Sequence, residues 1–183
     1  MNAAIALVSL VLACNAPRRR VALSTHDSRA VALGAACMLG ALVVLAAVAT
    51  PLLDALDVSA PNLRIGAGLV LAVVAAHDVV WRPPESGAAL AGLRAGIVPV
   101  LFPVLLRPEV ALLAIAIGAD HGVAFTLLSG ALAMAVVVAW HAVATPRADR
   151  PVLRRVERGL GVLDAGVTAA LAVAIVADGV FAI

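Results

Sequence analysis

Long apolar runs alternate with short polar stretches along the whole chain, and no run shows the alternating apolar and polar positions of a strand. Polar breaks separate six apolar segments, at 2–16, 30–53, 61–81, 97–117, 123–144 and 159–183. A helix of roughly 20 apolar residues crosses a hydrocarbon core of about 30 Å and satisfies its own backbone hydrogen bonds. The pattern therefore predicts an all-α membrane protein with six transmembrane helices in a single domain, 1–183.

The first apolar segment is short and broken. It ends at Asn15-Ala16-Pro17, immediately before Arg18-Arg19-Arg20. At 1.5 Å per residue the segment rises only about 22 Å, which is less than the thickness of the hydrocarbon core. We therefore expect either a tilted span or a segment that re-enters the membrane, with Asn15 and Pro17 at the break as candidate substrate-binding residues.

The fourth segment, IVPVLFPVLLRPEVALLA at 97–114, is interrupted near its middle. Pro103 and Pro108 each remove a backbone donor and disturb the helical ladder. Arg107 and Glu109 flank the second proline, although a charge deep in a membrane costs roughly 3 kcal/mol or more. Broken helices with polar groups at mid-depth are typical of transporter substrate sites, so Arg107, Pro108 and Glu109 are candidate substrate-binding residues. The alternative is a short loop between two half-length segments, or an Arg107–Glu109 pair without function.

Segments three and six resemble each other at an offset of one hundred residues. Because matches among Ala and Val arise by chance, the informative matches are Gly66 with Gly166 and Asp78 with Asp178. Each half of the chain, 1–82 and 94–183, holds three segments, so the halves must have opposite orientations. The sequence thus predicts two inverted three-helix repeats with broken first and fourth segments, an arrangement in which solute binds between the repeats.

The broken helices also indicate a mechanism. The N-terminal end of a half-helix carries a partial positive charge and attracts an anionic group, whereas exposed carbonyls at the other end attract an ammonium group or a coupling cation. A small zwitterion would satisfy both ends. Alternating access would then be a rocking of one half of the chain against the other.

Four further polar residues are candidates for ion or proton coupling: Asp78, Asp120, His121 and Asp178. Asp78 and Asp178 lie near opposite ends of the membrane, and the other two lie in the turn between segments four and five. Histidine changes its charge near neutral pH and can relay a proton. The alternative for each residue is an ordinary interfacial or solvated group.

Composition narrows the function classes. Hydrophobic residues make up 64% of the chain and charged residues 13%, whereas about 25% is typical of soluble domains. The net charge is +2, and no basic stripe with interleaved aromatic residues occurs, so we expect no nucleic-acid partner. Cys14 and Cys37 lack the spacing of a metal site, and no soluble-enzyme motif is present. We therefore expect no metal or other cofactor and no enzymatic activity.

Arginine, the chain's only strongly basic residue type, is distributed unequally among the loops. The loops after segments one, three and five hold eleven of these residues: Arg18, Arg19, Arg20, Arg29, Arg82, Arg94, Arg147, Arg150, Arg154, Arg155 and Arg158. The opposite loops hold essentially Arg64 alone. The positive-inside rule predicts that the arginine-rich loops face the cytoplasm and that both termini lie outside.

Several of these segments together resemble the MarC family of bacterial membrane proteins, in chain order. PNLRIGAGLVLAVVAAHDVV at Pro61–Val80 is similar to its third span, Ile97–Ala114 to its fourth segment, and Val156–Val180 to its last span. Asn15-Ala16-Pro17 resembles its first break. The resemblance implies a six-span protein of the bacterial inner membrane, similar to the lysine-exporter-like superfamily, that transports small neutral amino acids. Arg107 and Glu109 stand where the family usually has glycines, a departure that would change or block a glycine-sized site.

These observations predict a secondary transporter or exporter of a small solute by alternating access in the lipid bilayer, coupled to a cation or proton. High Ala and Gly content allows close packing within one chain or between chains, so a homo-oligomer is an open alternative. One competing class is a non-transporting scaffold or accessory protein, and another is a cation transporter with Glu109, Asp120 and Asp78 as ligands. The discriminating features are whether Arg107 and Glu109 line a cavity and whether the carboxylates cluster in space.

Overall fold

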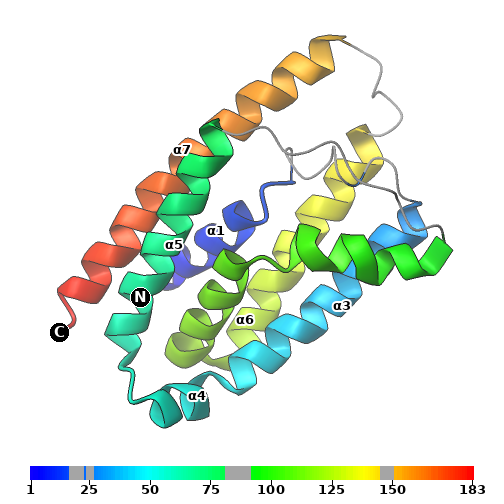
Figure 1. Cartoon of the computed structure of the whole chain (residues 1–183). Helices are drawn as coiled ribbons and strands as arrows, with labels where there is room; N and C mark the ends of the chain where they lie inside the picture. Colours follow the sequence, from blue (N-terminus) through cyan, green and yellow to red (C-terminus); the bar gives the residue numbers. More distant parts are fainter. Residues whose placement is uncertain (17–22, 24–26, 81–91, 145–150) are drawn as a thin grey trace.

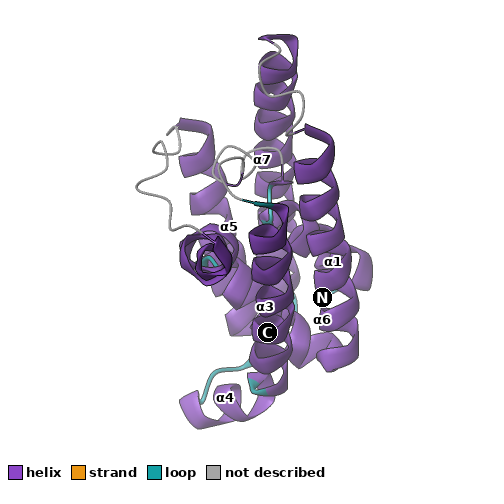
Figure 2. Ribbon diagram, turned by 90° about the vertical axis from the view of Figure 1, so that its right-hand side faces the viewer, coloured by secondary structure: helices purple, strands orange, loops and turns teal. Residues whose placement is uncertain are grey.

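The structure is a computed structural model of the chain, and it describes residues 1–16, 23, 27–80, 92–144 and 151–183. Within these ranges nearly every residue is helical and none is in a strand (Figure 2). In chain order the elements are α1 Ala3–Ala13, α3 Ser28–Ala47, α4 Ala49–Leu56, α5 Ala60–Val80, the 3-10 helix η1 Gly92–Gly96, the π-helix η2 Ile97–Leu105, α6 Pro108–Ala144 and α7 Pro151–Val180. The predicted all-α class is therefore confirmed.

Four helices in the described part of the chain are long and apolar enough to cross a membrane. They are Ser28–Ala47, Ala60–Val80, Pro108–Val143 and Gly159–Val180, and α1 is a shorter apolar helix. Large apolar side chains such as Val73 on α5 and Val173 on α7 are about two-thirds exposed, as expected for surfaces that face lipid. The length and apolar composition of these helices are thus those of an integral membrane protein.

Two predicted boundaries were wrong, both because proline starts helices well. The predicted second segment, 30–53, is divided at Val48, and Pro51 lies in the first turn of the separate short helix α4. The predicted loop 145–158 is helical from Pro151 onward, because α7 begins there and extends beyond its apolar part. Proline suits the first turn of a helix, where its missing N–H has no partner to lose.

Helix α6 reverses direction at Gly122. This residue has φ +79° and ψ 177°, which glycine adopts readily, and Figure 1 shows the chain folding back there. An added Cβ at Gly118 would touch Ala46, and one at Gly130 would touch Leu42. A straight helix would separate these two glycines by about 18 Å, yet both contact one turn of α3. Helix α6 is therefore a first arm, 108–121, and a second arm, 123–144.

The helices run alternately in opposite directions (Figure 1). Helices α1, α5 and the second arm of α6 run one way, and α3, the first arm of α6 and α7 run the other. The end of the bundle that holds Met1, α4, Gly122 and Ile183 is called the terminal end below. Helices α1 and α5 end toward the opposite end, where the second arm of α6 also ends and α3 and α7 begin.

The bundle is built from two closely packed helix pairs, α5 with α7 and α3 with α6, and α1 lies against α6 and α7. Glycines make the α5–α7 contact close. A Cβ at Gly68 would lie 2.7 Å from Val176 Cγ2 and 2.9 Å from the Ala172 carbonyl oxygen. The core between the pairs is apolar and buried, with Leu10, Leu71, Leu113, Ile117 and Ile175 at its centre.

We expect Gly68→Ala to lower the thermal stability of the purified protein, because the added methyl group overpacks the α5–α7 contact by about 1–3 kcal/mol. Gly66→Ala is the matched control, since a Cβ there meets no atom within 4 Å. Alanine favours a helix by roughly 1 kcal/mol over glycine, so the control should be neutral or slightly stabilising. Equal melting temperatures for the two variants would contradict the close contact.

Candidate functional site

The first helix break lies at Asn15. Helix α1 begins at a cap in which the Asn2 side chain accepts a hydrogen bond of 2.8 Å from the Ala4 N–H, and Cys14 is its C-cap residue. Asn15 has φ +38°, a left-handed conformation that asparagine tolerates better than most residues. Its N–H donates to the Leu12 carbonyl at 2.8 Å, and its side chain is buried. Pro17, the other predicted residue of this break, lies outside the described residues.

The second break lies between η2 and α6, as the sequence predicts. Helix η2 ends at Leu105, Leu106 has non-helical dihedral angles, and α6 begins at Pro108. Within η2, Val98 and Phe102 also have extended angles. Each of them precedes a proline, which disfavours the helical conformation of the residue before it. The interruption therefore extends further toward the N-terminus than Pro108 alone indicates.

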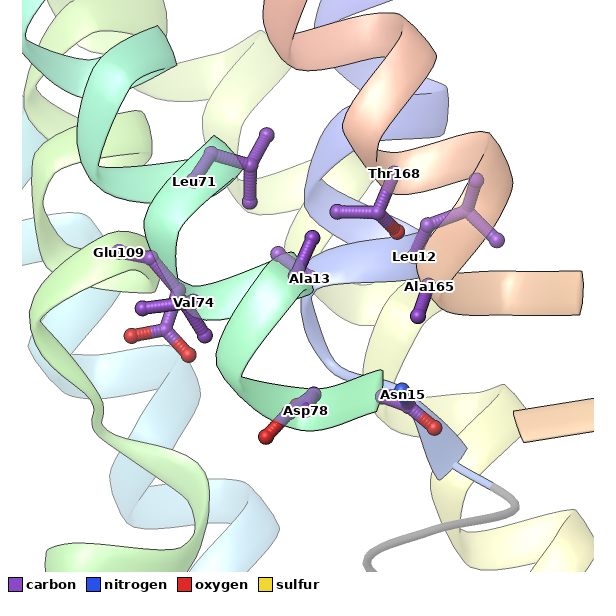
Figure 3. A pocket seen from close by; sticks show the side chains of 10 residues that line it. Leu12, Ala13, Asn15, Leu71, Val74, Asp78, Glu109, Ala165 and Thr168 are labelled. Atoms are coloured by element: carbon purple, nitrogen blue, oxygen red, sulfur yellow. The ribbon is translucent and has the colours of Figure 1, made fainter. Parts of the chain in front are cut away.

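A pocket lies where these two breaks meet α5 and α7 (Figure 3). Its polar lining residues are Asn15 from the end of α1, Asp78 from α5, Glu109 from the start of α6 and Thr168 from α7. Its apolar wall consists of Leu12, Ala13, Leu71, Val74, Ala75 and Ala165. The free volume is about 240 Å³ including the open side, while the enclosed part has room for about one water molecule.

Arg107 joins the two carboxylates of the pocket. Its Nε lies 3.0 Å from Glu109 Oε1, and its Nη1 lies 3.4 Å from Asp78 Oδ2. The Glu109 side chain is 1% exposed, that of Asp78 15% and that of Arg107 28%. Both carboxylates thus contact one guanidinium, and Asp78 Oδ1 also lies 3.7 Å from Nδ1 of His77.

Glu109 occupies the first turn of α6, where the helix dipole stabilises a negative charge. Of the two charges that the sequence places beside Pro108, Glu109 lines the pocket, and Arg107 contacts Glu109 and Asp78 as an ion-pair partner. The sequence leaves open whether these two charges line a substrate site or only pair with each other. In the structure they are paired, and one of them, Glu109, also lines the pocket.

Thr168 is a site residue that the sequence reasoning missed. Its side chain is 5% exposed, and its Oγ1 has no hydrogen-bond partner among the residues that the structure describes. A buried hydroxyl without a partner loses its hydrogen bonds to water and costs about 1–3 kcal/mol. The one signal in the sequence is a hydroxyl within an otherwise apolar helix, which by itself is common.

Three of the four predicted coupling residues lie away from the pocket. Asp120, His121 and Asp178 are at the terminal end, whereas Asp78 lines the pocket. Along α5 the distance from Asp78 to Arg64, the arginine that contacts Asp120 and Asp178, is about 21 Å at 1.5 Å per residue. The proposed set of Glu109, Asp120 and Asp78 is therefore not one cluster, and the described residues contain no group of three or more metal-ligating side chains.

The terminal end has its own ionic cluster, made of Arg64, Asp120, Asp178 and the Met1 amine. Arg64 donates from Nη2 and Nε to Asp120, at 2.6 and 2.9 Å, and from Nη1 to Asp178 at 3.0 Å. The Met1 nitrogen lies 3.2 Å from Asp120 and 3.3 Å from Asp178. His121 instead packs against the ring of Phe125, with ring centroids 4.8 Å apart. The cluster ties α5 to the reversal of α6 and to α7.

In comparisons with known proteins, no protein-family model, no curated protein and no solved structure matches this chain. The resemblance to the MarC family therefore stays a prediction that depends on the segments quoted above.

Proposed function

We propose that the chain is a secondary transporter of a small solute and that the pocket between α1, α5, α6 and α7 is its substrate site. One observation carries this proposal: two helix breaks far apart in the sequence meet at one pocket, whose lining includes the buried Glu109 and the mostly buried Asp78. Charged groups inside an apolar bundle are expensive to keep, and they mark solute or ion pathways in membrane proteins. Broken helices at mid-depth are the usual frame of such a site.

The path of the chain supports two inverted repeats of three segments each. Helices α1, α3 and α5 run away from, toward and away from the terminal end (Figure 1). The first arm of α6, its second arm and α7 run toward, away from and toward it. The matched residues Asp78 and Asp178 lie at opposite ends of the bundle, and each contacts an arginine. We propose six membrane segments in a bacterial inner membrane, with the terminal end outside by the positive-inside rule.

A neutral amino acid of the kind implied by the resemblance fits this pocket poorly. A zwitterion would place its carboxylate at the N-terminal end of α6, where the partial positive charge lies. Glu109 already supplies a carboxylate there. The solute that we propose is therefore small but need not be an amino acid.

Accessibility of the pocket from both sides of the membrane tests this function. In a Cys14→Ala, Cys37→Ser background, we expect Ala75→Cys, in the pocket wall, to react with a membrane-impermeant maleimide in both right-side-out and inverted vesicles. Alternating access exposes one site to each side in turn. Val73→Cys on the same helix is the control: it is 69% exposed toward lipid, where a thiol does not ionise, so it should react from neither side.

The competing function is a scaffold or accessory protein, and the Arg107–Glu109 pair favours it, because such a pair can simply hold two segments together. That function predicts that Ala75→Cys reacts from one side at most. Labelling confined to one side, in vesicles whose orientation is verified, would therefore contradict transport by alternating access.

A further inference from the structure

We infer that the pocket takes a small uncharged solute with an apolar body and a neutral hydrogen-bonding group, and that the Thr168 hydroxyl binds this group. The inference rests on the proposed function, because it names the chemical class of solute that the same site takes. It depends on three observations: the carboxylates of the pocket already have partners, the Thr168 hydroxyl has none among the described residues, and the rest of the lining is apolar.

The charged and amide groups of the pocket are occupied within the protein. Glu109 is paired with Arg107, and Asp78 contacts the same guanidinium. Asp78 also lies near Nδ1 of His77, and Asn15, Asp78 and Glu109 each have a further interaction. A cationic solute would displace Arg107 from its pair with the buried Glu109, which is costly. An anionic solute would be repelled by two carboxylates, so the pocket favours a neutral one.

The Thr168 hydroxyl differs from these groups, because it has no partner in the described part of the chain. It lies on α7, across the pocket from Glu109 of α6 (Figure 3). Its side chain is only 5% exposed. Buried polar atoms nearly always have a partner, and a hydroxyl can both donate and accept a hydrogen bond. A hydroxyl or amide group of a bound solute would therefore complete its hydrogen bonding.

Thr126 shows how another buried threonine of this bundle is accommodated. Its side chain is buried in the second arm of α6, and its Oγ1 donates to the Gly122 carbonyl at 3.0 Å. A threonine inside a helix can make such a bond to the carbonyl one turn earlier. Thr168, also inside a helix, makes no such bond to the Asp164 carbonyl. Its hydroxyl is therefore available to a group in the pocket.

The apolar lining and the size of the pocket define the body of the solute. The lining beyond the polar groups is aliphatic and comes from α1, α5 and α7: Leu12, Ala13, Leu71, Val74, Ala75 and Ala165. Such a surface favours an apolar body over water. The free volume of about 240 Å³, open side included, equals roughly eight water molecules at about 30 Å³ each. A short-chain amide or alcohol with few non-hydrogen atoms therefore fits.

The test is protection of Ala75→Cys, in the Cys14→Ala, Cys37→Ser background, against a maleimide in purified, detergent-solubilised protein at neutral pH. Propionamide and 1,2-propanediol are the neutral probes, and propionate and propylammonium are charged probes of similar size. We expect at least one neutral probe to slow the labelling in a saturable manner. The charged probes should need concentrations about tenfold higher or more for the same protection, because they disturb the paired carboxylates.

Two matched threonine variants assign the protection to one hydroxyl. Thr168→Val replaces an unpartnered hydroxyl by a methyl group of nearly the same size. It should therefore raise the melting temperature, and it should also raise the half-protecting concentration of the neutral probe by about three- to tenfold. Thr126→Val removes a hydroxyl that has a partner, so it should lower the melting temperature and leave the half-protecting concentration unchanged. Thr168→Ser keeps the hydroxyl and should retain the protection.

Three results would overturn the inference: labelling that neither neutral probe slows, equal protection by a charged probe, and protection unchanged in Thr168→Val. A Thr168→Val variant that is less stable than its parent, or that does not fold, would also overturn it, because the hydroxyl would then hold the bundle together. Two-sided labelling in vesicles tests transport separately. Labelling from one side with protection intact contradicts transport alone, whereas two-sided labelling without protection contradicts the solute class alone.

Discussion

Replacement of Arg64 by alanine is expected to destabilise the protein strongly. It would leave Asp120, whose side chain is 6% exposed, without its two shortest contacts. Removal of one partner from a buried ion pair costs about 3–5 kcal/mol, because the remaining charge stays buried. Loss of the cluster should also open the terminal end, so the maleimide should label Ala75→Cys faster from that side.

Two controls make this prediction specific. Arg29→Ala removes an exposed arginine of α3 and should change stability by only a few tenths of a kcal/mol. Asp178→Asn should be milder than Asp120→Asn, because Asp178 is one-third exposed and has a single contact with Arg64. The measurement is the midpoint of thermal or denaturant unfolding in detergent. If Arg64→Ala unfolds at the same midpoint as Arg29→Ala, the cluster does not hold the terminal end closed.

The second large effect is expected for Glu109→Gln, which keeps the shape of the side chain and removes its charge. Arg107 would then have only Asp78 as an ion-pair partner in the pocket, at 3.4 Å. Because Arg107 is 28% exposed and partly screened by solvent, we expect a loss of about 1–3 kcal/mol rather than the full cost of breaking a buried pair. The rate at which the pocket opens in turn to the two sides of the membrane should fall by about tenfold or more.

The measurements are the unfolding midpoint and the rate at which Ala75→Cys is labelled from each side. Glu109→Asp keeps the negative charge and should retain most of the two-sided labelling. A Glu109→Gln variant that is as stable and as evenly labelled as its parent would show that this carboxylate only fills space.

The helix breaks could be predicted from the sequence because their causes are local. Pro108 removes a backbone donor and Asn15 tolerates a left-handed conformation, and each effect acts on the chain beside it. The same local reasoning applied to Pro99 and Pro103 also accounts for the extended angles at Val98 and Phe102. The polar turn around Gly122 predicts the reversal of α6 for the same reason.

The composition of the site could not be predicted in full, because it depends on which helices touch. Asp78 and Glu109 are distant in the sequence, and nothing in their surroundings shows that Arg107 joins them. Thr168 is a single hydroxyl residue in an apolar helix, which does not indicate a site. Arg64 is predicted from the sequence only as an isolated arginine of an outer loop, although it contacts both Asp120 and Asp178. Asp120 is acidic, as are the two pocket carboxylates. An acidic side chain alone does not show at which end of the bundle it lies.

The reversal at Gly122 lets one short helix reach two charged groups. Glu109 lies in the pocket at one end of the first arm of α6, and Asp120 lies in the ionic cluster at the other. Between them Gly118 packs closely against Ala46 of α3. The arm is buried along its length at Val110, Leu113, Ala114 and Ile117, so it is held as one rigid rod. A change in the ionic cluster at the terminal end is therefore a change at the far end of the same rod that carries the pocket carboxylate.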